Sequence, residues 1–155
     1  MNLSVAQVLA VKLMKKHGLI EKGWSFEYDN AVKRFGVCRF RPKVIGLSRK
    51  LVLLNDVEKV EDTILHEIAH AIAGHKAGHG IEWKNVCVRI GAKPERCYDT
   101  SKTNNVELKY HAKCGACGKE YQKSRLVKKE RKRSCYCQVG KDWNNRVLLE
   151  YKARY

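Results

Sequence analysis

The sequence lacks any apolar run near the roughly 20 residues that a membrane-spanning helix needs. It also lacks the features of a targeting peptide, because Lys12, Lys15 and Lys16 interrupt the apolar N-terminal stretch and no small-residue cleavage site follows. Without a secretion signal, the seven cysteines and six histidines indicate a reducing compartment, where cysteines bind metal or stay buried as thiols. We therefore expect a cytoplasmic protein with no membrane contact.

Acidic residues are scarce. The chain has 16 Asp and Glu against 32 Lys and Arg, a formal net charge of +16. The excess is concentrated after residue 100, where 15 basic residues accompany only 5 acidic ones. A basic surplus of this size predicts attraction to polyanions, above all nucleic acid. The alternative is a solvated surface that only keeps the protein soluble.

One short stretch has the composition of a catalytic metal site. His66 and His70 are four residues apart, so a helix places both imidazoles on one face. Apolar residues at helical spacing surround them, and no glycine or proline interrupts the pattern before Gly74. Two neutral imidazoles at this spacing can bind one Zn²⁺, and Glu67 can take a proton from a zinc-bound water. The same five-residue pattern also occurs by chance in helices whose histidines face solvent or the core.

A third ligand has to come from further along the chain, and several residues are candidates. His79 follows a glycine-containing loop that could return it to the metal. His75 is only five residues past His70, which leaves it little room to turn back. Glu82 or Glu95 could serve if a second helix supplied a carboxylate ligand, although Glu82 lacks the usual signature of that class.

Taken together, HExxH at residues 66–70, a short glycine-containing loop and HGxxW at residues 79–83 resemble the SprT-like, or Spartan, metalloprotease family. The resemblance implies that His66, His70 and His79 bind the catalytic zinc and that Glu67 is the catalytic base. It also implies a zincin-like domain followed by a cysteine-bearing zinc ribbon. The chain has no long partner-binding tail after that ribbon, so it looks like the compact bacterial or phage type.

The hydrophobic pattern and the resemblance together predict an α+β fold. We expect a metalloprotease domain over residues 1–105 and a zinc-ribbon, DNA-binding subdomain over residues 106–155. The first should contain an N-terminal helix over residues 5–17, the HExxH helix over residues 56–73 and one further helix over residues 81–90. It should also contain a small antiparallel sheet, with the strand at 24–28 paired with the strand at 35–40 and a third strand at 43–48. Six apolar residues of the first helix should face the core: Val5, Val8, Leu9, Val11, Leu13 and Met14. Residues 51–55 should form an apolar connection. By resemblance, the strand at 43–48 should be the sheet edge that lines the substrate cleft.

A second metal site is predicted near the C-terminus. Cys114 and Cys117 form a C-x-x-C pair within a glycine-containing turn, and Cys135 and Cys137 follow as a C-x-C pair. Four thiolates can hold one structural Zn²⁺ in tetrahedral coordination. The tighter second pair departs from the expected C-x-x-C, which leaves open whether Cys137 is the fourth ligand. Unrelated buried cysteines are the alternative interpretation.

A run of basic residues lies between the two cysteine pairs and suits contacts with DNA phosphates: Lys123, Arg125, Lys128, Lys129, Arg131, Lys132 and Arg133. Affinity from such contacts falls steeply as salt rises. Aromatic residues interspersed with this region could stack on unpaired bases: Tyr110, Tyr121, Tyr136 and Trp143. No helix suited to reading a groove is visible, so sequence-specific recognition is not expected.

These patterns lead us to expect a DNA-dependent zinc metalloprotease with one catalytic and one structural zinc. By resemblance, its substrates are proteins bound or crosslinked to DNA, and its DNA partner is single-stranded or contains a junction. We expect a monomer associated with the nucleoid of a bacterium or of a phage-infected cell. Two alternatives remain: a general intracellular zinc peptidase without DNA dependence, and a non-catalytic zinc-dependent nucleic-acid-binding module.

Overall fold

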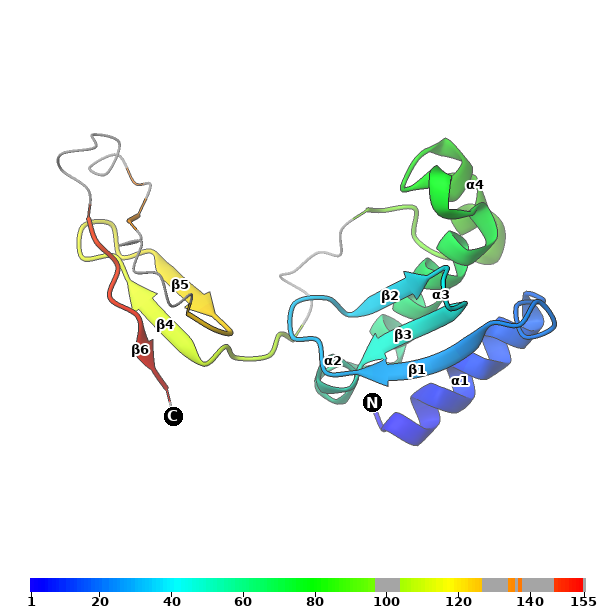
Figure 1. The fold of residues 1–155 in the computed structure, drawn as a ribbon, viewed down its shortest axis with the longest axis horizontal. Helices are drawn as coiled ribbons and strands as arrows, with labels where there is room; N and C mark the ends of the chain where they lie inside the picture. The colour runs from blue at the N-terminus through cyan, green and yellow to red at the C-terminus, as the bar shows by residue number, and fades with distance from the viewer. Residues whose placement is uncertain (97–103, 127–133, 136, 138–146, 155) are drawn as a thin grey trace. The chain divides into compact units, whose positions relative to one another are not determined.

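A computed structural model describes residues 1–96, 104–126, 134–135, 137 and 147–154 (Figure 1). The chain divides into two compact units, Met1–Val106 and Glu107–Tyr155. The fold mixes helices with two small sheets, which is the α+β composition that the sequence predicted. The domain boundary predicted from the sequence lies between residues 105 and 106.

The sheet of the first unit consists of β1 (Ser25–Asp29), β2 (Gly36–Arg39) and β3 (Val44–Ser48) in the order β1-β3-β2. β3 is therefore the central strand, parallel to β1 and antiparallel to β2. The expected hairpin pairing of the first two strands and the expected antiparallel sheet are both wrong. The physical reason is that all five residues of β3 are buried, whereas β1 and β2 have no buried residue. The strand whose residues are buried on both faces takes the middle.

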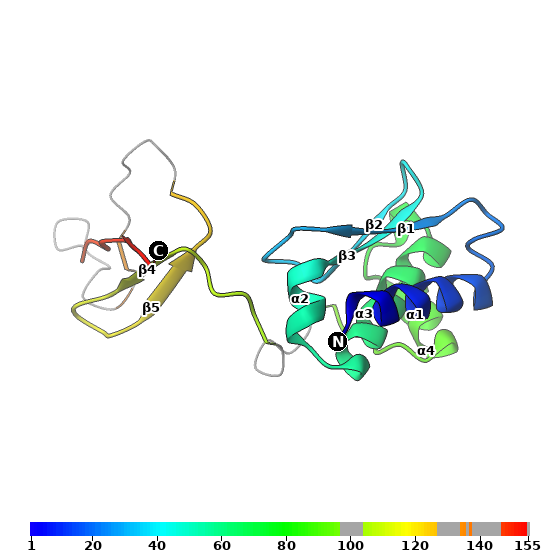
Figure 2. The same ribbon diagram turned by 90° about the horizontal axis from the view of Figure 1, so that it is seen from below.

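The described residues of this unit also form four helices and one 3₁₀ turn: α1 (Leu3–Lys16), α2 (Arg49–Leu54), α3 (Val57–Ala73), η1 (His75–Ala77) and α4 (Ile81–Ile90). α1 and α3 pack together on the same face of the sheet (Figure 2). α2 takes up most of the segment that was expected to be only an apolar connection, residues 51–55. It forms because the Ser48 side chain accepts a hydrogen bond from the Leu51 N–H and so caps the helix at the end of β3.

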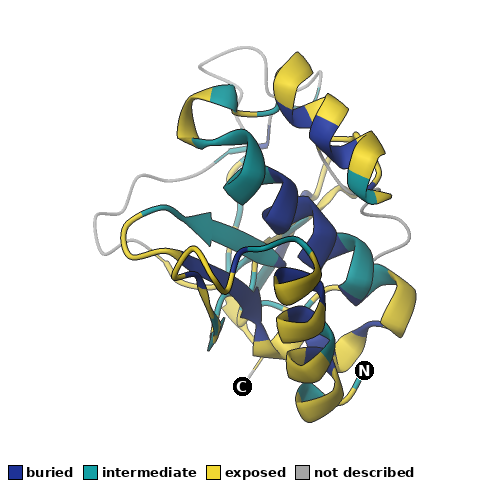
Figure 3. Ribbon diagram, turned by 90° about the vertical axis from the view of Figure 1, so that its right-hand side faces the viewer, coloured by how far each residue is buried: buried dark blue, intermediate teal, exposed yellow. Residues whose placement is uncertain are grey.

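The face that α1 presents to the core matches the sequence prediction only in part, because Leu13 and Met14 are buried as expected but the three valines are not. Val5, Val8 and Val11 are 55%, 68% and 41% exposed, and Ala6 and Ala10 are fully buried in their place. Small side chains on the inner face let the α1 backbone lie close to α3, and the larger valines then remain outside. Figure 3 shows the general arrangement, with buried residues between the helices and the sheet and exposed residues on the outer helical faces.

α3 runs through the centre of the unit. The Asp56 side chain caps it by accepting from the Lys59 N–H. Every residue of α3 from Thr63 to Ala69 is buried, because the sheet, α1 and α4 all pack against this helix. The two polar residues of the motif in that segment, His66 and Glu67, are therefore held inside the protein by tertiary packing.

The second unit contains an antiparallel sheet in the order β5-β4-β6. Its strands are β4 (Tyr110–Lys113), β5 (Glu120–Lys123) and β6 (Lys152–Ala153). The few buried residues of this unit include Ala112, Cys114 and Cys135, so its centre is partly made of cysteines. In the part of the chain that the structure describes, no helix of either unit has the length and apolar character to cross a membrane.

Candidate metal centres

Three histidines converge beside the C-terminal half of α3. His66 and His70 lie one turn apart on this helix, and His79 lies in the turn between η1 and α4. The Nε2 atom of His79 is 3.1 Å from Nε2 of His70 and 3.3 Å from Nε2 of His66. The chain reverses at Gly74 and Gly78, whose φ angles of +89° and +51° favour glycine. This reversal brings His79 back to the other two imidazoles.

The histidine cluster fits a zinc ion. Zinc–nitrogen bonds of about 2.0–2.1 Å at tetrahedral angles place the ligand nitrogens about 3.3 Å apart, close to the spacing found here. Burial lowers the pKa of His66 to about 3 and that of His70 to about 4, and it also lowers the pKa of His79. The imidazoles are therefore neutral near pH 7, which is the form that binds metal.

Trp83 supports all three rings. Its side chain is fully buried, and its ring centroid lies 4.8 Å from that of His66, 5.3 Å from that of His70 and 4.6 Å from that of His79. An aromatic surface against every ring restricts how the imidazoles can turn, so the cluster is rigid before any ligand binds. The tryptophan of the HGxxW pattern thus has a packing role at the site itself.

The rival third ligands lie elsewhere. His75 is exposed, and its ring packs edge-on against Phe40 at a centroid distance of 5.4 Å. Glu82 and Glu95 are exposed as well, and neither belongs to the metal-ligand clusters found among the described residues. Of the candidates that the sequence left open, only His79 joins His66 and His70.

Glu67 is buried beside this cluster, and its environment shifts its acidity. Burial raises the pKa of its carboxyl group to about 8 in the metal-free protein. The positive charge of Arg34 and a hydrogen bond from the backbone N–H of Cys38 act in the opposite direction and lower this pKa. A group with a pKa near neutrality is suited to both accepting and releasing a proton at physiological pH.

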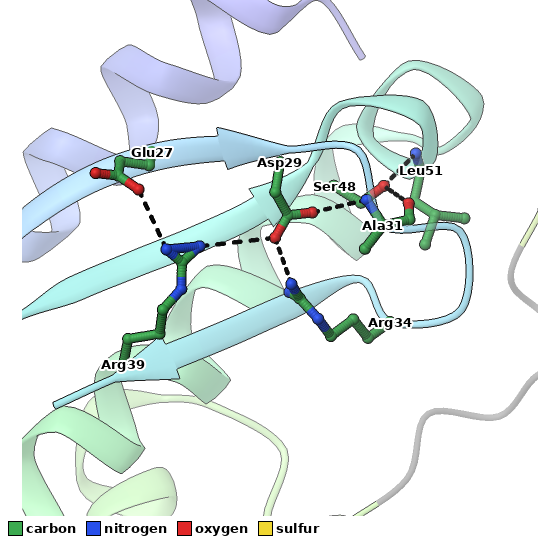
Figure 4. Close-up of polar contacts among 7 residues, drawn as sticks. All are labelled: Glu27, Asp29, Ala31, Arg34, Arg39, Ser48 and Leu51. Carbon is green, nitrogen blue, oxygen red and sulfur yellow. Dashed lines mark hydrogen bonds and ion pairs between the residues drawn. The ribbon is translucent and has the colours of Figure 1, made fainter. Parts of the chain in front are cut away.

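The charge of Arg34 is held in place by a small polar network on the sheet (Figure 4). Arg34 pairs with the Asp29 carboxylate at 2.6 Å, and the same carboxylate accepts from the backbone N–H of Ala31 at 2.9 Å. Arg39 lies 3.8 Å from Asp29 and 3.2 Å from Glu27. Asp29 thus connects β1 to the segment that leads into β2.

β2 is an edge strand, and it runs alongside α3. The carbonyl of Phe35 accepts from the Ser48 N–H of β3. Backbone groups alternate along a strand, so those of Gly36 and Cys38 point away from β3 toward the free edge. The resemblance had implied that the strand at 43–48 lines the cleft. That expectation is wrong, because β3 is central and the edge beside Glu67 belongs to β2.

Sequence reasoning did not single out Gly36, which lies against Glu67, or Arg34, whose charge acts on Glu67. A glycine inside a strand pattern is a known signal of close backbone approach, and Gly36 carried that signal. Nothing in the local sequence marked Arg34.

The four cysteines of the second unit also converge. The sulfur atoms of Cys114, Cys117, Cys135 and Cys137 all lie within 4.8 Å of one another. The Cys117–Cys135 distance of 3.6 Å is near the separation of about 3.8 Å expected for thiolates at 2.3 Å from one tetrahedral zinc. Cys137 belongs to the cluster despite its C-x-C spacing, so four ligand atoms are available for one ion.

The structure describes only part of the predicted DNA-binding run. Lys123 lies in β5 with its Nζ atom 4.7 Å from the ring centroid of Tyr151, and Arg125 is exposed. The remaining basic residues and two of the aromatic residues named with them lie outside the described residues: Lys128, Lys129, Arg131, Lys132, Arg133, Tyr136 and Trp143.

A helix that carries two histidines and a buried glutamate, with a third histidine returning to it, defines a candidate metal centre of the metallopeptidase type. The sequence model of the SprT-like family matches residues 9–109, which contain the whole centre. The chain is also 31% identical over 112 residues to Protein SprT of Actinobacillus succinogenes, which corresponds to 68% of this chain and 66% of that protein. The chain therefore belongs to the SprT-like family, as its motifs predicted. It spans just under two thirds of the length of that curated relative.

Proposed function

We propose that this protein is a zinc-dependent endopeptidase of the zincin type that acts on proteins bound to DNA. The observation that carries the proposal is the convergence of three neutral imidazoles next to a buried carboxylate whose pKa is raised to about 8. His66, His70 and His79 would hold a catalytic zinc ion and leave one tetrahedral position open.

When bound, the ion would polarise the scissile carbonyl and acidify a water molecule. Glu67 would take up the proton of that attacking water and deliver it to the departing amine. Trp83 would keep the histidine rings in position, and Arg34 with the Cys38 N–H would favour the charged form of Glu67 that accepts the proton.

The edge of β2 suits a polypeptide substrate, which would bond to the backbone groups of Gly36 and to the Cys38 carbonyl because the Cys38 N–H donates to Glu67. An extended peptide can add to an edge strand through backbone hydrogen bonds, and such binding does not depend strongly on side-chain sequence. Because β2 lies directly beside Glu67, a peptide bound along it would pass close to the three histidines. This arrangement fits an enzyme that cuts unfolded or extended segments of many proteins.

The second unit would supply the link to DNA and hold a structural zinc. Its four cysteines fit this ion, and the basic excess after residue 100 favours binding to the phosphate backbone. We propose single-stranded or junction-containing DNA as the partner, DNA-crosslinked proteins as the substrates, and crosslink repair on the bacterial or phage nucleoid as the setting.

The test is a cleavage assay with the zinc-loaded full chain and a DNA-binding protein as substrate, with single-stranded, double-stranded or no DNA. We expect cleavage that requires DNA and a loss of about 10²–10⁴-fold for Glu67→Gln, which keeps the shape of the side chain but cannot accept the proton. Equal cleavage without DNA would instead indicate a general peptidase. No cleavage by the zinc-loaded parent would indicate a non-catalytic nucleic-acid-binding module.

A further inference from the structure

Gly36 lies against Glu67 with no room for a side chain. A Cβ atom at this position would lie 2.5 Å from Oε1 and 2.7 Å from Cγ of Glu67, and 2.9 Å from Cγ2 of Thr63. Carbon atoms in favourable contact are about 3.5–4.0 Å apart, so even a methyl group would collide with both residues.

Neither neighbour can easily move away. Thr63 is fully buried and its hydroxyl donates to the Lys59 carbonyl at 2.9 Å, which holds its side chain against α3. Glu67 is 7% exposed and accepts from the Cys38 N–H. The side chains of Thr63 and Glu67, which lie on two successive turns of α3, therefore fill the space beside Gly36.

Backbone conformation does not explain the glycine. The φ angle of Gly36 is not positive, and the residue lies in an ordinary extended strand that any amino acid can adopt. Position 36 requires a glycine because there is no space for a side chain on the side of β2 that faces α3.

We propose that Gly36 is a positioning residue for Glu67: its missing side chain lets β2 lie directly on this glutamate, so that the Cys38 N–H can hold the carboxylate. The proposal rests on the role proposed for Glu67 as the catalytic base. Substitution of Gly36 would push β2 and the carboxylate apart, and the carboxylate would lose both its fixed orientation and its backbone donor.

Gly46 offers a matched control in the same sheet. A Cβ atom there would be similarly crowded, at 2.9 Å from Cγ1 of Val37 and 3.2 Å from Nη2 of Arg39. Gly46 pairs with Val37, the residue next to Gly36 in β2, so the added methyl group would lie on the opposite face of the sheet from Glu67. The methyl group of Gly46→Ala would contact the side chains of Val37 and Arg39, and not Glu67.

The first measurement is steady-state cleavage by zinc-loaded Gly36→Ala and Gly46→Ala at equal zinc content. A misplacement of about 1 Å can cost on the order of 10²-fold in rate, so we expect kcat to fall at least about ten-fold for Gly36→Ala, with a smaller change in KM from the displaced edge of β2. Gly46→Ala should stay within about three-fold of the parent. Equal kcat for the two variants, or an effect of Gly36→Ala on KM alone, would overturn the proposal.

The second measurement is thermal unfolding of Gly36→Ala in the parent and in the Glu67→Ala background, which removes the two closest colliding atoms. Residues in direct contact couple, so the loss of Tm should shrink by about half or more in that background. If Gly36→Ala alone does not fold, we expect the double variant Gly36→Ala, Glu67→Ala to fold and to unfold cooperatively, which would support the contact in the same way. An equal loss of Tm in both backgrounds, or no recovery, would overturn the Gly36–Glu67 contact. An inactive parent would refute the proposed function and leave this coupling unchanged.

Discussion

Arg34 and Asp29 form a 2.6 Å ion pair that places a positive charge near the buried carboxylate of Glu67. This charge lowers the pKa of Glu67, which burial has raised to about 8. We predict that Arg34→Gln raises the pKa of Glu67 further and moves the acidic limb of the kcat/KM profile to higher pH. Because the Arg34 side chain is 47% exposed, the effect on kcat/KM below that limb should be at most about five-fold and should weaken as salt increases.

Arg39→Gln is the control for this prediction. Arg39 also approaches Asp29, at 3.8 Å, but it is not among the charges that act on Glu67. Its substitution should leave the acidic limb in place. An equal shift for both variants would mean that the network acts on the fold of the sheet and not on the charge at Glu67.

The raised pKa of Glu67 has a consequence for the stability of the metal-free protein. The folded state keeps a proton on Glu67 up to a pH of about 8, whereas the unfolded chain releases it near the ordinary value of 4.5. Between these values the folded state binds more protons at Glu67, so the contribution of this residue to stability is greatest below pH 4.5 and is lost as pH rises toward 8. A shift of this size corresponds to roughly 3–5 kcal/mol across the window.

We predict that Glu67→Gln removes this loss because glutamine stays neutral at every pH. The free energy of unfolding of the metal-free variant should therefore exceed that of the metal-free parent by an amount that grows from pH 4.5 to pH 8. Denaturant titrations at several pH values measure the difference, and contributions from other titrating groups cancel in the comparison. A constant difference would show that Glu67 is ionised in both states.

Two candidate metal centres in separate units predict two zinc ions per chain. His70→Ala should remove about one equivalent, because two imidazoles hold zinc much more weakly than three. Cys114→Ser should remove the other equivalent and leave the histidine site loaded. Metal analysis by mass spectrometry measures both, and a correctly folded parent with a single zinc would contradict the ribbon assignment.

The hydroxyl group of Tyr121 lies 2.9 Å from the sulfur of Cys135. Its hydrogen bond is the largest of several that together lower the pKa of that thiol to about 7, the others coming from the neighbouring cysteines. A hydrogen bond to a ligating thiolate stabilises its charged form, and removing such a hydrogen bond typically weakens metal binding by about 10–100-fold. We predict that Tyr121→Phe loses its ribbon zinc to a chelator at lower chelator concentration. Tyr110→Phe, in the same sheet but away from the sulfur atoms, should behave like the parent.

The basic run between the cysteine pairs predicts salt-dependent DNA binding. The test variant carries four alanine substitutions, at Lys128, Lys129, Arg131 and Arg133. We expect it to bind single-stranded DNA more weakly. The slope of log affinity against log salt concentration should become shallower by about 0.7 for each phosphate that the variant no longer neutralises. Zinc content should not change. Fluorescence anisotropy at several salt concentrations measures the affinity and the slope.

The control for this variant removes exposed lysines from α1 in the first unit: Lys12, Lys15 and Lys16. If their removal lowers the salt slope as much per residue as the ribbon changes do, the binding is a general effect of net charge. An unchanged slope for the ribbon variant would mean that its basic run is only a solvated surface.

The candidate ligands could be predicted from the sequence because their geometry is local. The spacing of His66 and His70 places both on one helical face, and a glycine-containing loop of a few residues can return His79. The two close cysteine pairs are short-range patterns of the same kind. The bounds of α3 and α4 follow equally from apolar periodicity, a capping Asp56 and a terminating Gly91.

Only the tertiary structure decided which segments meet. The central place of β3 and the inward face of Ala6 and Ala10 depend on how elements far apart in sequence share buried surface, and the periodicity of one segment does not contain that information. The same holds for Gly36 and Arg34, which are more than 30 residues from Glu67 along the chain: Gly36 lies against Glu67, and the charge of Arg34 acts on it. The sequence by itself determined the residues that can bind a metal, and tertiary packing decided how buried Glu67 is and which neighbours set its charge.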